Sequence, residues 1–221
     1  MSPATVPRVV FFDFDGVLAD TESVHVAAWE RTFGALGWDI PAETCARAAE
    51  QDDRAFLRDV FHTRGCPEGD LDGWVARKQQ LTRMLLADAP RLYPGVRALV
   101  ETLRDRDIRL GVVSSTWREN IAIVLGTEAL IHAFAWVVCK EDVAALKPAP
   151  DAYHLALARA KIPPAAALAL EDSPSGLHSA RAAGIRPVAI GHRRAAGPWT
   201  GESVYLKDLR DPHAMLRLLE P

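Results

Sequence analysis

Near its start the chain reads Val9-Val10-Phe11-Phe12-Asp13-Phe14-Asp15-Gly16-Val17-Leu18-Ala19-Asp20. A run of large apolar residues ends in two aspartates one residue apart, followed by glycine. The run is short, bulky and not amphipathic, which predicts a strand covered on both faces, as in parallel sheets. Asp13 and Asp15 then lie at its carboxyl end, outside which open α/β sheets bind their ligands.

This pair of aspartates has two interpretations. The dipeptide Asp-Gly is typical of a turn, so an acidic turn after a strand explains the stretch without any chemistry. The second interpretation is electrostatic: two carboxylates this close repel each other unless a cation lies between them or one stays protonated. Polar residues at the ends of later strands decide between the two.

The composition is that of an ordinary globular protein, with 221 residues, 49% hydrophobic and 25% charged, enough for one core and a small extra domain. The net charge of −3 gives no reason to expect binding to nucleic acid or to a membrane. No apolar run is long enough to span a bilayer, and the start lacks a signal-peptide pattern. The three cysteines follow no pairing pattern, which favours reduced thiols and a cytoplasmic location.

Residues 20–90 show helical spacing and no strand pattern. Val26, Trp29 and Phe33 recur on one helical face, and Gly34 and Gly37 end that helix. Further helices are expected at 42–49, 53–63 and 70–87. We therefore expect a helical insertion between the first strand and the rest of the chain.

After residue 90, strand patterns alternate with helical ones. Strands are predicted at 108–113, 134–138, 166–170, 188–190 and 203–206. This alternation indicates right-handed β-α-β units. The expected fold is α/β: a Rossmann-like doubly wound parallel sheet from residues 1–19 and 91–221, with a small all-α domain of residues 20–90 inserted after the first strand. The glycine motifs of dinucleotide-binding and P-loop proteins are absent.

The ends of the later strands also carry polar residues. Ser114 closes the second predicted strand, Lys147 follows the third, and Glu171 and Asp172 close the fourth. The carboxyl ends of parallel strands share one edge, so these groups and the two aspartates are expected around one small volume. Carboxylates suit Mg²⁺, and a lysine with a hydroxyl suits phosphate. Phosphoryl transfer needs this kind of charge neutralisation and positioning.

Each of these residues alone also has a structural explanation. Ser114 suits a helix cap, Lys147 a solvated loop, and Glu171-Asp172 an acidic pair at a helix start. Only the ordered set, each member following its own strand, favours the functional interpretation.

The ordered set resembles the motifs of the haloacid dehalogenase (HAD) superfamily of phosphohydrolases. Asp13 to Asp20 matches its first motif, DxDGxLxD, and the later matches are Ser114, Lys147 in Lys-Pro-x-Pro, and Glu171-Asp172-Ser173 followed by Gly176. The resemblance covers nearly the whole chain. It is closest to the branch that holds β-phosphoglucomutase and phosphoglycolate phosphatase, whose helical C1 cap falls where residues 20–90 do.

The resemblance implies roles for the acids. Asp13 would be the nucleophile that forms an aspartyl-phosphate. Asp15 would protonate the leaving alcohol and then activate water. Mg²⁺ would be held by Asp13, the backbone carbonyl of Asp15, and Asp172, with Glu171 as a direct or more distant partner.

The resemblance also assigns Ser114 and Lys147 to the phosphoryl oxygens, where Lys147 would offset the crowded negative charge. It argues against a dehalogenase, because dehalogenases of this fold lack the second aspartate and the magnesium acids, whereas Asp15 and Asp172 are both present here. No clear equivalent of the cap lysine of phosphonatases is present.

Substrate contacts are expected from the cap and from Ser115. The segment Asp20 to His25 resembles DTExxH at the junction of core and cap, which would bring His25 over the site. The family's arginine for a distal phosphate is missing from its usual segment, although Gln51 and Arg54 lie there among acidic residues. Lys78 falls near a lysine found late in many such caps, and a solvated helix face explains it equally well.

These features predict a Mg²⁺-dependent phosphatase of a small phosphorylated metabolite, a sugar or polyol phosphate. A β-phosphoglucomutase-type mutase is the alternative that the motifs permit. A catalytically idle binding module ranks last, because no catalytic residue is missing. The expected partner is the small phosphorylated substrate, with no nucleic acid and no membrane, and the expected state is a monomer or weak homodimer.

Overall fold

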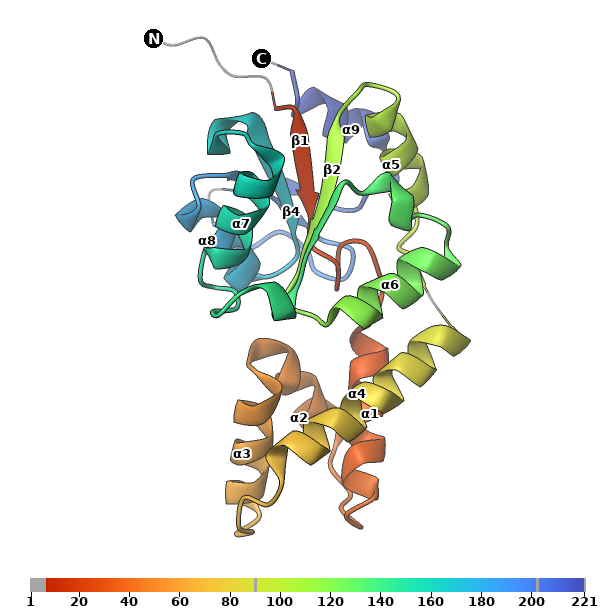
Figure 1. Ribbon diagram of the computed structural model, residues 1–221, viewed down its shortest axis with the longest axis vertical. Helices are drawn as coiled ribbons and strands as arrows, with labels where there is room; N and C mark the ends of the chain where they lie inside the picture. Colours follow the sequence, from red (N-terminus) through yellow and green to blue (C-terminus); the bar gives the residue numbers. More distant parts are fainter. Residues whose placement is uncertain (1–6, 90, 202, 221) are drawn as a thin grey trace. The chain divides into compact units, whose positions relative to one another are not determined.

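The computed structural model describes residues 7–89, 91–201 and 203–220. The chain divides into two compact units: Thr21–Pro90 forms one, and Met1–Asp20 together with Arg91–Pro221 forms the other. The fold is α/β, with a helical segment between the first two strands, which confirms the fold class expected from the sequence (Figure 1). The domain boundaries stay a prediction.

The larger unit is built on a parallel sheet of six strands in the order β3-β2-β1-β4-β5-β6. The strands are β1 (Val9–Phe12), β2 (Arg109–Val113), β3 (Trp136–Val138), β4 (Ala167–Glu171), β5 (Arg186–Ile190) and β6 (Val204–Leu206). The chain moves outward from β1 to β3 and then returns to β4 on the other side of β1. Such a reversal is the point at which open α/β sheets bind ligands, and it lies between β1 and β4.

Helices cover both faces of this sheet. Figure 1 shows α7 (Asp151–Ala160) and α8 (Pro174–Ala182) on one face, and α5 (Val96–Arg104) and α9 (Pro212–Arg217) on the other. All four residues of β1 are fully buried, with Val9 and Phe11 in the cluster that includes α7 and α8. Full burial of each such side chain contributes roughly 1.5–3 kcal/mol, which explains why the apolar run forms the central strand. The helix α6 (Arg118–Thr127) connects β2 to β3.

The smaller unit contains only helices among its described residues. They are α1 (Glu22–Gly34), α2 (Ala42–Ala46), α3 (Asp53–Thr63) and α4 (Leu71–Asp88). Its core is aromatic: the ring of Trp29 lies 5.4 Å from that of Phe33 and 5.0 Å from that of Phe56, centroid to centroid. The helix expected at 42–49 ends at Ala46 and continues as the 3₁₀ turn Arg47–Glu50.

The chain leaves and re-enters the larger unit at adjacent points. Ala19 and Leu92 form an antiparallel bridge, and the N–H of Asp20 donates to the carbonyl of Arg91 at 2.9 Å. The N–H of Tyr93 donates to the carbonyl of Leu18 at 3.0 Å. These bonds tie the two crossings together at the base of the insertion.

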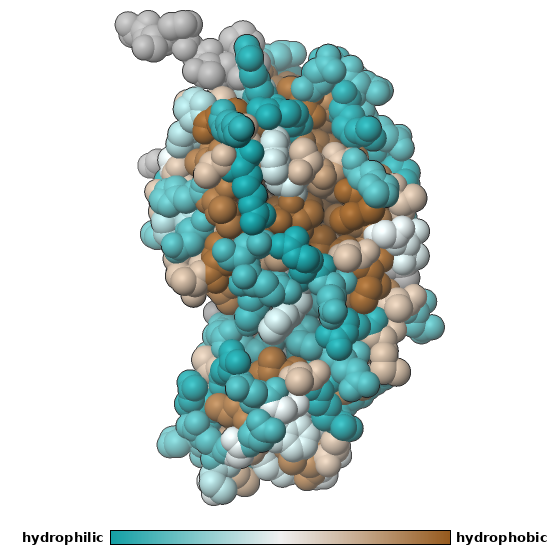
Figure 2. Space-filling model, viewed as in Figure 1, coloured by the Kyte–Doolittle hydropathy of each residue, from teal (hydrophilic) through white to brown (hydrophobic). Residues whose placement is uncertain are grey.

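The surface mixes hydrophilic and hydrophobic residues on the face shown in Figure 2. In the described part of the chain, the large hydrophobic side chains that stand exposed are Met84 and Val204, one in each unit. No helix among the described residues combines the length and apolarity that crossing a membrane requires.

Candidate active site

The site begins at the end of β1. The N–H of Asp13 donates to the carbonyl of Leu170 at 2.9 Å, which sets Asp13 beside the end of β4. Gly16 follows with φ +84°, a conformation that residues with a side chain rarely adopt. A Cβ at Gly16 would overlap the carboxylate of Asp172. Glycine therefore allows both the turn after β1 and the close approach of the acid from β4.

Lys147 links the acids of β1 and β4. Its Nζ donates to Asp13 Oδ1 at 2.7 Å, to Glu171 Oε1 at 2.6 Å and to the carbonyl of Val113 at 2.7 Å. Only 5% of its side chain is exposed. An ammonium has three protons to donate, and three acceptors take them. Lys147 is thus a fixed, buried positive charge between two carboxylates, not a solvated loop lysine.

Glu171 is the last residue of β4 and is fully buried. Its Oε1 accepts hydrogen bonds from Lys147 and from the hydroxyl of Tyr153, the latter at 2.5 Å. Its Oε2 is buried and has no hydrogen-bond partner among the residues that the structure describes. A Cβ at Gly176 would overlap this oxygen, so glycine in the first turn of α8 makes room for the carboxylate. The next residue, Asp172, lies with its Oδ2 3.6 Å from the guanidinium of Arg193.

These acids form a set that fits a metal ion. Asp13, Glu171 and Asp172 each offer an oxygen, and the three oxygens lie within 4.8 Å of one another. Burial raises the pKa of Asp13 well above its usual value; Lys147 opposes this rise, and the charges of Glu171 and Asp172 add to it. Burial, followed by the charges of Glu171 and Asp15, raises the pKa of Asp172 to about 7. The cluster therefore holds more negative charge than its lysine balances, which a bound cation would relieve.

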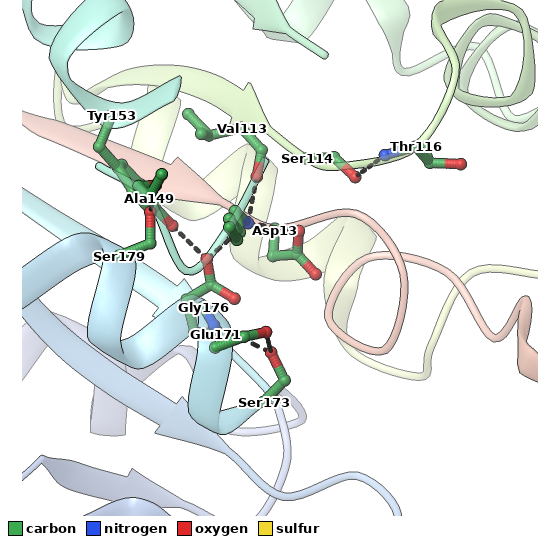
Figure 3. A network of polar contacts seen from close by, with 12 residues as sticks. Asp13, Val113, Ser114, Thr116, Ala149, Tyr153, Glu171, Ser173, Gly176 and Ser179 are labelled. Carbon is green, nitrogen blue, oxygen red and sulfur yellow. Dashed lines mark hydrogen bonds and ion pairs between the residues drawn. The ribbon is translucent and has the colours of Figure 1, made fainter. Parts of the chain in front are cut away.

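Asp15 and Ser114 lie at the same edge of the sheet. Asp15 is partly buried, and its charge contributes to the raised pKa values of Asp13 and Asp172. Ser114 is buried directly after β2, where its Oγ accepts from the N–H of Thr116 at 3.1 Å. Figure 3 shows Ser114 on the side of the acid cluster where Asp13 lies. Ser115 is partly buried, and no hydrogen bond joins it to the acids among the described residues.

In the helical unit, two of the predicted substrate residues come together. Lys78 Nζ lies 3.2 Å from His25 Nδ1 and 3.4 Å from Asp53 Oδ1, and 5.3 Å from the centre of the Trp29 ring. Gln79 Nε2 donates to the other oxygen of Asp53 at 3.1 Å. Only 4% of the Lys78 side chain is exposed, so the interpretation of Lys78 as part of a solvated helix face is wrong. The cluster instead gives the helical unit a buried positive group.

The other two predicted substrate residues of the helical unit make different contacts. Arg54 Nε bonds to Asp72 Oδ1 at 2.5 Å, and about half of each side chain or more is exposed. Gln51 Nε2 donates to Asp59 Oδ2 at 3.3 Å on the exposed side of α3. Both contacts lie within the helical unit. The predicted role of Gln51 and Arg54 in substrate binding stays a prediction.

Two residues of the site follow no motif that we recognised in the sequence. In the sequence, Tyr153 is only one member of an apolar helical pattern. The partner of its hydroxyl, Glu171, is brought beside it when α7 packs on the sheet. Arg193 lies in the loop after β5, where no pattern points to the site. Their proximity to Lys147 on one side and Asp172 on the other comes from the order of the strands.

Comparison with known proteins is consistent with this geometry. Residues 10–190 match the family model described as haloacid dehalogenase-like hydrolase. Protein CbbY of Rhodobacter capsulatus is 34% identical over 196 residues, which are 82% of this chain and 84% of the relative. Phosphorylated carbohydrates phosphatase of Thermotoga maritima is 27% identical over 82% of this chain and 83% of its own. The crystal structure of a variant of CbbY from Rhodobacter sphaeroides in complex with xylulose-(1,5)bisphosphate aligns with a TM-score of 0.79 and 27% identity, covering 93% of this chain and 96% of that chain.

Proposed function

Since this chain belongs to the haloacid dehalogenase-like hydrolase family and is a phosphoric monoester hydrolase, we propose that it is a Mg²⁺-dependent phosphatase of a small phosphorylated sugar or polyol. The observation that carries the proposal is the buried ammonium of Lys147 between Asp13 and Glu171, beside Asp172, at the reversal point of the sheet. The substrate class is supported by the Thermotoga maritima relative, which is a phosphatase of phosphorylated carbohydrates, and by the sugar bisphosphate bound to CbbY.

The reaction that we propose has two steps. An oxygen of Asp13 attacks phosphorus in line, the bond from phosphorus to the ester oxygen breaks, and the leaving alcohol takes a proton from Asp15. Asp15, now a carboxylate, takes a proton from water, whose oxygen attacks the phosphorus of the aspartyl-phosphate. Inorganic phosphate leaves, Asp13 is regenerated, and Asp15 carries its proton again.

The other residues of the site hold the reacting groups. Lys147 fixes the carboxylate of Asp13 and offsets negative charge on the phosphoryl oxygens, and Ser114 donates to one of those oxygens. Asp13, Asp172 and Glu171 would hold the Mg²⁺, whose oxygen preference they match and which supplies further charge neutralisation. In the helical unit, His25 and Lys78 would contact the part of the substrate away from the reacting phosphate. The expected monomeric or weakly dimeric state and cytoplasmic location stay predictions.

The experiment is a phosphate-release screen with p-nitrophenyl phosphate and a panel of phosphorylated sugars and polyols, xylulose 1,5-bisphosphate included, with Mg²⁺ and with EDTA. We expect release that requires Mg²⁺ and is abolished in Asp13→Asn. The matched control is Asp105→Asn, which neutralises an exposed carboxylate of the larger unit and should behave like the wild type. Equal rates for wild type and Asp13→Asn would refute the proposal. Conversion of β-glucose 1-phosphate to glucose 6-phosphate with a bisphosphate primer, without free phosphate, would favour a mutase.

A further inference from the structure

Tyr153 occupies a place where phenylalanine would fill the same space. It is fully buried in α7, its ring lies 6.2 Å from that of Phe11, and the ammonium of Lys147 lies 5.3 Å from its ring centre. These ring contacts do not need a hydroxyl. A buried hydroxyl loses its hydrogen bonds to water, so its presence has a cost unless it finds a partner. The partner here is Glu171 Oε1, at 2.5 Å.

The hydrogen bonds to Glu171 are unequally divided between its two oxygens. Within the described part of the chain, Oε1 accepts from two donors, Lys147 Nζ at 2.6 Å and the hydroxyl of Tyr153, whereas the buried Oε2 accepts from none. A rotation of the carboxylate out of its present plane would carry Oε1 away from both donors and weaken both bonds. The two donors therefore hold the plane of the carboxylate and leave Oε2 able to bind a cation or to accept a hydrogen bond. Figure 3 shows Tyr153 reaching Glu171 from α7, while Asp13 approaches from β1.

Lys147 alone would hold Glu171 less firmly. The same ammonium also donates to Asp13 and to the carbonyl of Val113, so its position is a compromise among three acceptors. The hydroxyl of Tyr153 approaches from a different helix and has no such competing acceptor among the hydrogen bonds of the described residues. It supplies a second donor to Oε1 from another direction, so that two hydrogen bonds, and not one, hold the orientation of the carboxylate.

From this geometry we propose that Tyr153 is a positioning residue: it orients Glu171 so that Oε2 is presented to the divalent cation or to a water bound to it. The inference rests on the proposed function, because it concerns the metal site of the same reaction. Tyr153 acts through Glu171 and does not touch the reacting atoms. Partners that orient metal ligands in this way typically change metal affinity by about 10–100-fold when removed.

The test is Tyr153→Phe, which keeps the ring and removes only the hydroxyl. Binding of Mg²⁺ is measured by isothermal titration calorimetry, and binding of Mn²⁺ by electron paramagnetic resonance, neither of which depends on turnover. We expect the Kd for Mg²⁺ to rise about 10–100-fold, while kcat at saturating Mg²⁺ changes far less. The matched control is Thr32→Val, which removes a buried hydroxyl bonded to the carbonyl of Ala28 in the helical unit and should leave the Kd unchanged.

Two further variants separate positioning from a general structural role. In a Glu171→Gln background, Tyr153→Phe should weaken metal binding little more, because the group through which it acts is already altered. Placing 4-aminophenylalanine at position 153 restores N–H donors at the same point and should return the Kd toward that of the wild type. This second variant also keeps the test decisive where Tyr153→Phe folds poorly.

The inference is overturned where Tyr153→Phe binds Mg²⁺ as tightly as the wild type, or where its effect is equally large in Glu171→Gln. The titration of the wild type separates this from failure of the proposed function. A wild type that binds Mg²⁺ but releases phosphate from no ester contradicts the proposed function, and the comparison of Kd values still decides the role of Tyr153. A wild type that binds no divalent cation overturns both.

Discussion

Replacing Lys147 with methionine removes one buried charge from between two others. Methionine keeps most of the length and the apolar stem of lysine but loses all three hydrogen bonds, which join Nζ to Asp13, Glu171 and the carbonyl of Val113 at 2.6–2.7 Å. The side chains that lose their partner are buried: 12% of Asp13 is exposed, and none of Glu171. The variant therefore leaves two carboxylates in the interior without their counter-charge.

The size of the effect follows from this burial. Removing one partner of a buried ion pair costs about 3–5 kcal/mol, because the remaining charge stays desolvated. Losing the donor to the carbonyl of Val113 adds about 1 kcal/mol. We expect the free energy of unfolding to fall by about 4–6 kcal/mol at pH 7.5 without a metal ion, a large part of the 5–15 kcal/mol typical of a domain.

The loss should also depend on pH. In the wild type, the charge of Lys147 opposes the burial that raises the pKa of Asp13, so its removal raises that pKa further. A carboxyl whose folded pKa lies above its unfolded value stabilises the fold as the pH falls, because the folded state binds the proton more tightly. The difference between wild type and Lys147→Met should therefore be largest at pH 7.5 and smaller at pH 5.

The assay is urea unfolding followed by circular dichroism, in EDTA, at both pH values. The matched control is Arg97→Met, which removes an exposed ion pair with Glu128 at 2.9 Å and should cost at most about 1 kcal/mol. A Lys147→Met variant as stable as the wild type at pH 7.5, or one that loses more stability at pH 5 than at pH 7.5, would show that this reasoning about the buried charge is wrong.

Three other substitutions test separate parts of the structure. Gly16→Ala places a side chain on a residue at φ +84°, which costs about 1–2 kcal/mol, and displaces Asp172, so calorimetry should show weaker Mg²⁺ binding. The control Gly95→Ala, at φ +92°, should lower the stability without changing Mg²⁺ binding, and equal Kd values for the two variants would contradict the expectation. Burial raises the pKa of Asp142, but hydrogen bonds from the thiol and N–H of Cys139 and from Arg159 lower it to about 2. The charge of Asp142 therefore stabilises the fold above about pH 4, and this contribution is lost as the pH falls toward about 2. The stability gap between wild type and Asp142→Asn in urea should then be wider at pH 6 than at pH 3, and a constant gap would count against it. Trp29→Ala should cost about 3–5 kcal/mol and speed amide exchange mainly within residues 21–90, since its fully buried ring forms the core of the helical unit; unchanged exchange there would exclude this.

The fold and the strand ends could be predicted because both depend on local sequence. An apolar run of four residues, Val9–Phe12, has few alternatives to a central strand, and the alternation of strand and helix patterns after residue 90 leaves little freedom of topology. Parallel strands share one carboxyl edge, so the convergence of Asp13, Lys147, Glu171 and Asp172 followed from their positions after successive strands. The roles given to these side chains stay predictions that the variants above test.

Other features were decided only by tertiary packing. The sequence left Lys78 open between a solvated face and a functional one, and only the packing of α1 and α3 on α4 buries it against His25, Asp53 and Trp29. The hydroxyl of Tyr153 became significant because α7 lies against the sheet beside Glu171. The periodicity of apolar residues predicts which face of a helix is buried. It does not predict which polar atom a buried side chain will contact, because that atom belongs to a segment distant in the chain that only folding brings close.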